Sequence, residues 1–199
     1  LEFSYCTIPN ELVPFDYQTF EAFPGHVEAG VTNLETGQAE YKEVTTEDKH
    51  FRLLQATCAM PLMFPVFHLD GKPYLDGGAA DAVPYRRAFE QGCDRVVVIL
   101  TKPRSFVRKA ERLLPLIQRR YREYPNFCRT MEERPERDNQ SRAELFRLEK
   151  EGKALVIAPN TLHGVGRIEH NVDKLRMLWA EGYQQGMENM EQIRSFMDR

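Results

Sequence analysis

An aspartate followed by two glycines is the feature of this sequence best suited to chemistry. Asp76, Gly77 and Gly78 follow a strand-like run and precede a predicted helix. Open α/β sheets bind ligands outside the carboxyl ends of their strands, and glycines let a ligand or a loop approach the backbone closely. A carboxylate placed there can serve as a general base when burial and neighbouring groups raise its pKa toward the working pH. The alternative is that Asp76 only caps the next turn, because Asp and Gly are common turn residues.

Two predicted hairpins lead up to this aspartate. Residues 26–32 and 39–44 are strand-like on either side of a run of turn formers, so they predict the first hairpin. Residues 66–69 and 72–75 flank Asp70-Gly71, and Asp-Gly is a strong signal for a tight hairpin turn because that turn needs positive φ. Asp76 follows the second hairpin directly.

The remainder of the chain predicts a sheet that is partly parallel. Residues 95–101 and 154–158 are apolar and rich in β-branched side chains, which is typical of parallel strands covered on both faces. A helix over 85–91, closed by Gly92, precedes the first of these strands. Alternating strands and helices predict an α/β fold.

The predicted helices of the second half are charged and rich in proline. Residues 104–151 are expected to be helical, with interruptions at Pro115, Pro125 and Pro135. Asn171 is expected to cap a long final helix. Its apolar residues are expected to face inward, and they are Leu175, Leu178, Trp179, Tyr183, Met187 and Met190.

Composition narrows the class of protein. The chain has 199 residues, of which 42% are hydrophobic, so one domain is the expectation. A net charge of -3 provides no general attraction for nucleic acid, and no glycine-rich motif for a nucleotide cofactor is present. The four cysteines are widely spaced, which indicates reduced thiols and a cytoplasmic location. No membrane span or signal peptide is visible.

A metal site is an alternative use of the same hairpin. His68, Asp70 and Asp76 could converge on a metal ion. A hairpin places alternate residues on one face without closing a shell of ligands, so this alternative is disfavoured. We expect no metal and no cofactor.

The order of motifs around the aspartate resembles that of a known family. The segment Ala56-Thr57-Cys58-Ala59-Met60-Pro61 fits the beginning of the pattern A-[ST]-x-A-x-P-x-x-F-x-P, although Phe64 and Pro65 are adjacent here. A hairpin, the Asp76-Gly77-Gly78 turn and Val83-Pro84 follow in order. This set resembles the later half of patatin-like acyl hydrolases, including bacterial patatin-like phospholipases. The likeness covers residues 26–103, and extends more loosely to 154–158 and the last helix.

The resemblance implies a three-layer α/β/α fold and a Ser-Asp dyad that hydrolyses lipid carboxylic esters. Asp76 would take the proton of a serine that stands in a G-x-S-x-G elbow, while backbone N–H groups of a glycine-rich loop stabilise the oxyanion. Gly77 and Gly78 would shape the turn, and Asp81 would fix the loop that follows.

The nucleophile that the resemblance requires has no counterpart in this sequence. None of Ser4, Ser105, Ser141 and Ser195 stands in G-x-S-x-G, and no glycine-rich oxyanion loop is present. We therefore expect residues 1–199 to form one domain that is the C-terminal portion of a patatin-like domain. Its parts would be a core at 26–103, a helical insertion at 104–152, and a return strand with a final helix at 153–199.

Two expectations follow from the missing serine. The 199-residue chain by itself is inactive. A missing N-terminal half, or a second copy of the chain, pairs with its open strand edges. The alternative from another class is a non-catalytic α/β module for binding or interaction, which keeps the turn for its structure alone.

A basic stretch at residues 102–122 suggests one further partner. It contains eight arginines and lysines, with apolar residues at helical spacing between them. Such a stretch can lie on an anionic membrane surface, which predicts peripheral membrane contact. The alternative is a helical lid whose charged face is solvated, as on most surface helices.

Overall fold

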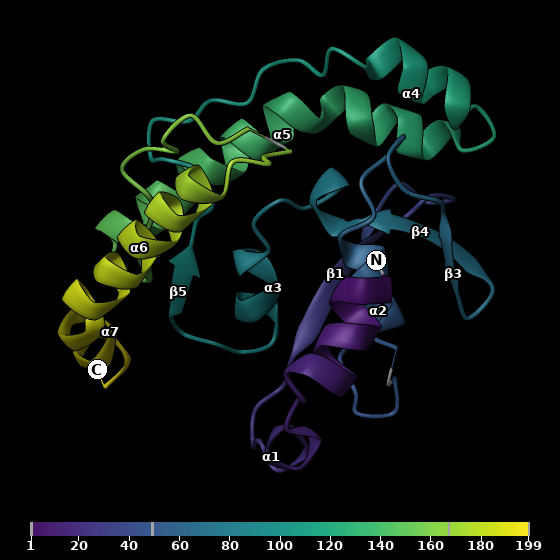
Figure 1. Cartoon of the computed structure of the whole chain (residues 1–199). Helices are drawn as coiled ribbons and strands as arrows, with labels where there is room; N and C mark the ends of the chain where they lie inside the picture. Colours follow the sequence, from purple (N-terminus) through teal and green to yellow (C-terminus); the bar gives the residue numbers. More distant parts are fainter. Residues whose placement is uncertain (1, 49, 167, 199) are drawn as a thin grey trace. The chain divides into compact units, whose positions relative to one another are not determined.

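The computed structural model describes residues 2–48, 50–166 and 168–198, so Leu1 lies outside the described residues (Figure 1). Its contacts divide the chain into two compact units. The first unit comprises the residues up to Ala82 together with Lys109–Asp138, and the second comprises Val83–Arg108 together with the residues from Asn139 onward. The expectation of one domain over 1–199 stays a prediction.

The first unit is built on an antiparallel sheet in which both predicted hairpins are confirmed. The strand order is β2-β1-β4-β3. Asp70 and Gly71 have φ values of 52° and 77°, which is the pair of positive φ angles that a tight Asp-Gly turn needs. The strands are β1 (Glu28–Asn33), β2 (Ala39–Glu43), β3 (Phe67–Leu69) and β4 (Lys72–Asp76).

Short helices and part of one long helix complete the first unit. Asp16 caps α1 by accepting a hydrogen bond from the Thr19 amide at 2.9 Å. The helices are η1 (Phe3–Leu12, a π-helix), α1 (Tyr17–Glu21), α2 (Arg52–Thr57), η2 (Gly77–Ala79, a 3₁₀ turn), α4 (Leu114–Arg120) and the part of α5 (Pro125–Lys150) up to Asp138.

The prolines of the helical region do not act alike. Pro115 lies in the first turn of α4 and Pro125 is the first residue of α5, where a missing N–H costs nothing. Pro135 lies inside α5, so the prediction that it interrupts the helix is wrong. Buried side chains on either side of it, Met131 and Leu145, hold both parts of the helix by packing, which outweighs the lost backbone hydrogen bond.

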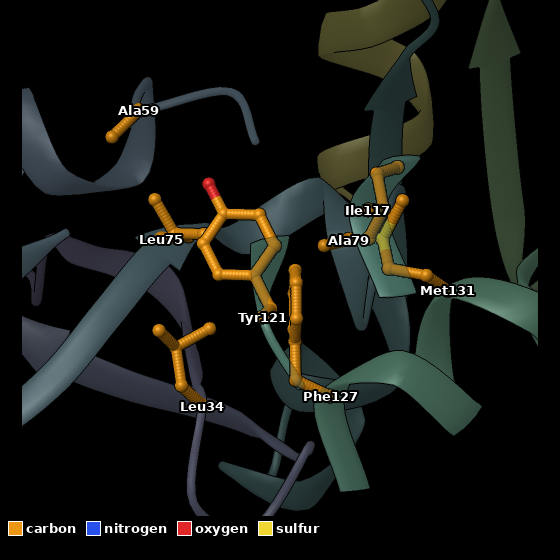
Figure 2. Packing of buried hydrophobic residues seen from close by; sticks show 8 residues of the cluster. All are labelled: Leu34, Ala59, Leu75, Ala79, Ile117, Tyr121, Phe127 and Met131. Atoms are coloured by element: carbon orange, nitrogen blue, oxygen red, sulfur yellow. The ribbon is translucent and has the colours of Figure 1, made fainter. Parts of the chain in front are cut away.

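The core of the first unit joins the sheet to α4 and α5. Figure 2 shows its side chains converging from these elements. Tyr121 and Phe127 meet edge to face with ring centroids 5.2 Å apart, and Phe127 is fully buried. The cluster comprises Leu34, Ala59, Leu75, Ala79, Ile117, Tyr121, Phe127 and Met131.

The second unit contains a parallel strand pair, so the predicted α/β fold is confirmed. β5 (Val96–Ile99) pairs in parallel with β6 (Ala154–Ile157), and the antiparallel and parallel strands together give the mixed composition expected. Ile99 is 74% exposed, so β5 is not covered on both faces as expected. The helices of this unit are α3 (Tyr85–Glu90), the part of α5 from Asn139, α6 (Val172–Glu188) and α7 (Met190–Met197).

Helix α6 has the predicted start but not the predicted burial. Asn171 caps it by accepting hydrogen bonds from the amides of Asp173 and Lys174. The expectation that its apolar residues face inward is wrong, since Trp179 is 70% exposed and Tyr183 62%. Periodicity identifies the apolar face of a helix but not what covers that face.

Replacing Phe127 with Ala should destabilise the first unit by about 3–5 kcal/mol, because the loss of a buried ring leaves a cavity in a packed core. Urea unfolding followed by circular dichroism measures this change. The matched control is Phe23→Ala in the same unit, where the ring is 54% exposed and the expected change is below about 0.5 kcal/mol. Equal losses in the two variants would contradict the assignment of the core.

Candidate functional site around the turn after strand β4

Asp76 ends β4 and caps the turn that follows. It is half-buried, and its Oδ1 accepts a hydrogen bond from the Gly78 amide at 2.7 Å. This hydrogen bond caps η2, which is the local role weighed against catalysis in the sequence. The carboxylate is thereby held in one orientation at the carboxyl end of a strand.

The two glycines are required because neighbouring groups approach their backbone closely. A Cβ atom on Gly77 would lie 2.1 Å from the carbonyl oxygen of Gly30 in β1. A Cβ atom on Gly78 would lie 3.0 Å from Asp76 Oδ1 and 3.7 Å from Arg134 Nη2. Only glycine fits at position 77, and position 78 is tight.

The side chain of Thr32 in β1 forms hydrogen bonds to both ends of the turn. Its side chain is fully buried, and its Oγ1 donates a hydrogen bond to the Asp76 carbonyl at 2.8 Å. The same oxygen accepts a hydrogen bond from the Ala80 amide at 3.1 Å. One hydroxyl therefore ties together both ends of the turn, using its donor and its acceptor capacity.

The small-residue segment before the second hairpin holds the turn from another side. The Ala59 carbonyl accepts a hydrogen bond from the Asp76 amide at 2.9 Å, and the Thr57 hydroxyl donates to the Gly30 carbonyl. Ala56 and Ala59 are fully buried. Larger side chains at these two positions would push the segment away from the strands.

Helix α5 contacts the far end of the turn. Arg137 Nη2 donates a hydrogen bond to the Ala79 carbonyl at 2.6 Å, and its Nη1 donates to the Thr130 carbonyl at 3.2 Å. Arg134 forms an ion pair with Asp138 at 3.6 Å, with both side chains largely buried. The part of α5 that belongs to the first unit therefore presents guanidinium groups to the turn.

The carboxylate of Asp81 anchors the loop that leaves the turn. Its Oδ2 accepts a hydrogen bond from the Tyr41 hydroxyl of β2 at 2.6 Å. The Asp81 amide donates to the Gly77 carbonyl at 2.9 Å. Asp76, Gly77, Gly78 and Asp81 thus lie together in one short segment, and their roles in chemistry stay predictions.

A second polar cluster lies within the same sheet. Glu40 accepts hydrogen bonds from the Tyr74 hydroxyl at 2.6 Å and from Asn33 Nδ2 at 2.7 Å. Burial opposes ionisation of Glu40, yet these two hydrogen bonds hold its pKa below its ordinary value. Burial first, and then Glu40 itself, raise the pKa of Tyr74. The cluster ties β1, β2 and β4 together as an ionised, hydrogen-bonded structural unit.

Metal binding gains no support in the described part of the chain. Among residues 2–48, 50–166 and 168–198, no three His, Cys, Asp or Glu side chains are grouped so that they could hold a metal ion. His68 is exposed on β3. The four cysteines are free thiols.

Sequence reasoning missed Thr32 and Arg137, which hold the turn at its two ends. Thr32 stands in a predicted strand, and Arg137 in a predicted charged helix, without any local signal that separates them from their neighbours. The serines are placed apart from each other along the fold. Ser4 lies in η1, while Ser105, Ser141 and Ser195 belong to the second unit.

Two family models match the chain. The model described as Patatin-like phospholipase matches residues 5–89, which include β1 to β4 and the Asp76 turn. The model described as Domain of unknown function (DUF6363) matches residues 124–198, which begin just before α5. No curated protein matches the chain.

These matches correct one expectation. The first match lies in the N-terminal part of the chain, so the description of the chain as the C-terminal half of such a domain is not borne out. Residues 154–158 and the last helix, where the resemblance was looser, fall within the second match instead.

Replacing Gly77 with Ala should destabilise the first unit by about 1–3 kcal/mol, because the added methyl group would overlap the Gly30 carbonyl. Thermal unfolding measures the change. The matched control is Gly182→Ala in α6, where a Cβ atom meets nothing within 4 Å. That substitution should stabilise by about 0.5–1 kcal/mol, so the two effects have opposite signs. A neutral Gly77→Ala would contradict the close approach of the two strands.

Proposed function

We propose, from the match of residues 5–89 to the patatin-like phospholipase family model, that Asp76 is the general base of a Ser-Asp dyad that hydrolyses lipid carboxylic esters. The observation that carries the proposal is the rigid setting of the Asp76 carboxylate. It stands at the carboxyl end of β4, in a turn tied to β1 through Thr32 and the close approach of Gly77. A base held in one orientation is what proton transfer requires.

In the proposed reaction, Asp76 accepts the proton of the serine hydroxyl as the serine oxygen attacks the ester carbonyl. Collapse of the tetrahedral intermediate breaks the bond to the alcohol, which leaves with that proton. Water then attacks the acyl-enzyme and gives a proton to Asp76. Collapse of the second tetrahedral intermediate breaks the bond between the acyl group and the serine oxygen, which takes that proton back from Asp76 as the fatty acid leaves. A carboxylate is a weak base toward a serine, so most of the barrier reduction must come from oxyanion stabilisation.

We further propose that the serine of this dyad lies outside residues 1–199. None of the four serines stands in a G-x-S-x-G elbow. The 199-residue chain alone is therefore proposed to be inactive, and the serine comes from a further segment of the protein or from a second copy.

A second candidate function rests on the hydrogen bond from the Gly78 amide to Asp76 Oδ1. This hydrogen bond alone would explain why an aspartate stands at position 76. A non-catalytic α/β module for binding or interaction would keep Asp76 for that reason alone.

Replacing Asp76 with Asn separates the two functions. Asn retains an oxygen that can cap the turn, but it cannot accept the serine proton. In the longest expressed form of the protein, the variant should lose hydrolysis of a p-nitrophenyl ester by on the order of 100-fold or more. The parent form should also react with a fluorophosphonate probe.

The control is Asp70→Asn, at an exposed carboxylate in the preceding hairpin, which should keep full activity. The 199-residue chain should neither react with the probe nor hydrolyse the ester. Full activity in Asp76→Asn would reject the Ser-Asp dyad and favour the non-catalytic binding module. Turnover by the 199-residue chain that Asp76→Asn abolishes would refute the proposed inactivity.

We also propose that α4 contacts an anionic lipid surface. Ile117 and Tyr121 are buried in the core, whereas Leu113 and Leu116 are 49% and 51% exposed on the outer side. Exposed arginines accompany the leucines, and a surface hollow here is lined by Leu116, Arg119, Arg120, Arg122 and Glu123. Residues 102–108 of the basic stretch belong to the second unit.

On such a face the arginines can bind anionic lipid headgroups while the leucines insert between those headgroups. None of the helices in the described residues is long and apolar enough for a membrane span. The apolar and basic outer face of α4 and the free thiols lead us to propose the membrane surface on the cytoplasmic side as the location, where the thiols would stay reduced.

Reversing the charges of Arg119, Arg120 and Arg122 to Glu should strongly weaken co-sedimentation with vesicles that contain phosphatidylserine. Each basic residue near such a surface contributes about 1 kcal/mol. The control reverses the exposed residues Arg147, Lys150 and Lys153 of the second unit and should leave binding unchanged. Equal binding by the α4 variant and the parent protein would reject this surface.

A further inference from the structure

The turn that carries Asp76 is completed by a helix from the other matched segment. Asp76 lies within residues 5–89, and α5 begins within residues 124–198, which match the domain of unknown function. The part of α5 up to Asp138 nevertheless belongs to the same compact unit as the turn. The boundary between the two family matches therefore does not coincide with the boundary of the packed unit.

Side-chain packing is the first link between this helix and the turn. Phe127 and Met131 of α5 are buried in the same cluster as Ala79, which is the last residue of η2 (Figure 2). Leu75, the residue before Asp76, is fully buried in that cluster as well. The aspartate thus lies between two residues whose positions depend on the packing of α5.

A charged hydrogen bond is the second link. The Ala79 carbonyl is at the C-terminal end of η2, where a helical turn leaves carbonyl groups without partners within it. Arg137 supplies the donor at 2.6 Å, and a charged donor makes a stronger hydrogen bond than a neutral one. The second donor of the same guanidinium is on the Thr130 carbonyl of α5, so the group is held from both sides.

Thr32 and Arg137 act at successive points of one short segment. Thr32 holds the Asp76 carbonyl and the Ala80 amide, while Arg137 holds the carbonyl between them in the sequence, that of Ala79. Thr32 and Arg137 come from the two separate segments of the chain that make up the first unit. Between them they fix the path of the backbone that determines where the Asp76 carboxylate points.

We propose that Arg137 is a positioning residue for Asp76, and that residues 124–138 of the segment of unknown function serve as part of the patatin-like domain. The catalytic part of this statement rests on the proposed role of Asp76. The structural part does not, because it concerns only the order of the turn. In this view the first helix of the unknown segment is required for the geometry of the site.

Hydrogen–deuterium exchange on the 199-residue chain tests the structural part. The reporters are the amides of Gly78, Ala80 and Asp81, which are all hydrogen-bonded within the turn or to Thr32. In Arg137→Ala they should exchange roughly ten-fold faster, because a charged hydrogen bond to the turn is lost. The control is Arg129→Ala, an exposed arginine of the same helix, which should leave these amides unchanged.

Kinetics on the longest expressed form test the catalytic part. Arg137→Ala should lower kcat by on the order of 100-fold with little change in KM, since a misplaced base slows the chemical step without weakening substrate binding. Arg137→Lys should recover part of the loss, because an ammonium can still donate to the Ala79 carbonyl. Added guanidinium ion should also partly restore Arg137→Ala, at concentrations that leave the parent protein unchanged.

The outcomes separate the two proposals. If Asp76→Asn abolishes activity and Arg137→Ala leaves kcat intact, the positioning role is overturned while the dyad stands. If Asp76→Asn has no effect, the dyad fails, and the exchange experiment alone decides whether Arg137 orders the turn. Unchanged exchange in Arg137→Ala overturns the structural part in either case.

Discussion

Strand β1 and the turn after β4 touch backbone to backbone at Gly77, and the geometry of the candidate site depends on this contact. A side chain at position 77 would overlap the Gly30 carbonyl, so the turn can lie this close to the strand only because it begins with glycine. The close approach brings Thr32 within hydrogen-bonding distance of both ends of the turn. The orientation of Asp76 then follows from its own bond to the Gly78 amide.

The remaining contacts can be understood as supports of that first one. The small residues Ala56 and Ala59 let the segment before the second hairpin lie against the strands. The Ala59 carbonyl also accepts a hydrogen bond from the Asp76 amide. Packing of Phe127 and Met131 brings α5 against the other side. A polar turn inside a packed unit needs a partner for each backbone group, and these elements provide partners for several of them.

Features set by neighbours in the sequence could be predicted, whereas those set by distant residues could not. The Asp70-Gly71 hairpin and the Asn171 cap of α6 are local, because the residue types themselves favour the required dihedral angles and hydrogen bonds. The continuation of α5 through Pro135 depends on burial that no local pattern reveals. Thr32 and Arg137 meet the turn across 44 or more positions in the chain, so single-sequence reasoning had no means to connect them.

The tryptophan on the exposed face of α6 makes intrinsic fluorescence sensitive to the surroundings of this helix. Trp179 is the only tryptophan in the sequence, and it stacks on Tyr183 at a centroid distance of 5.6 Å while 70% exposed. Its indole is already largely hydrated in the folded chain. Intrinsic fluorescence would therefore change little when the core melts. It would shift toward shorter wavelengths when another surface covers α6, so the emission maximum reports the docking of this helix more directly than it reports folding.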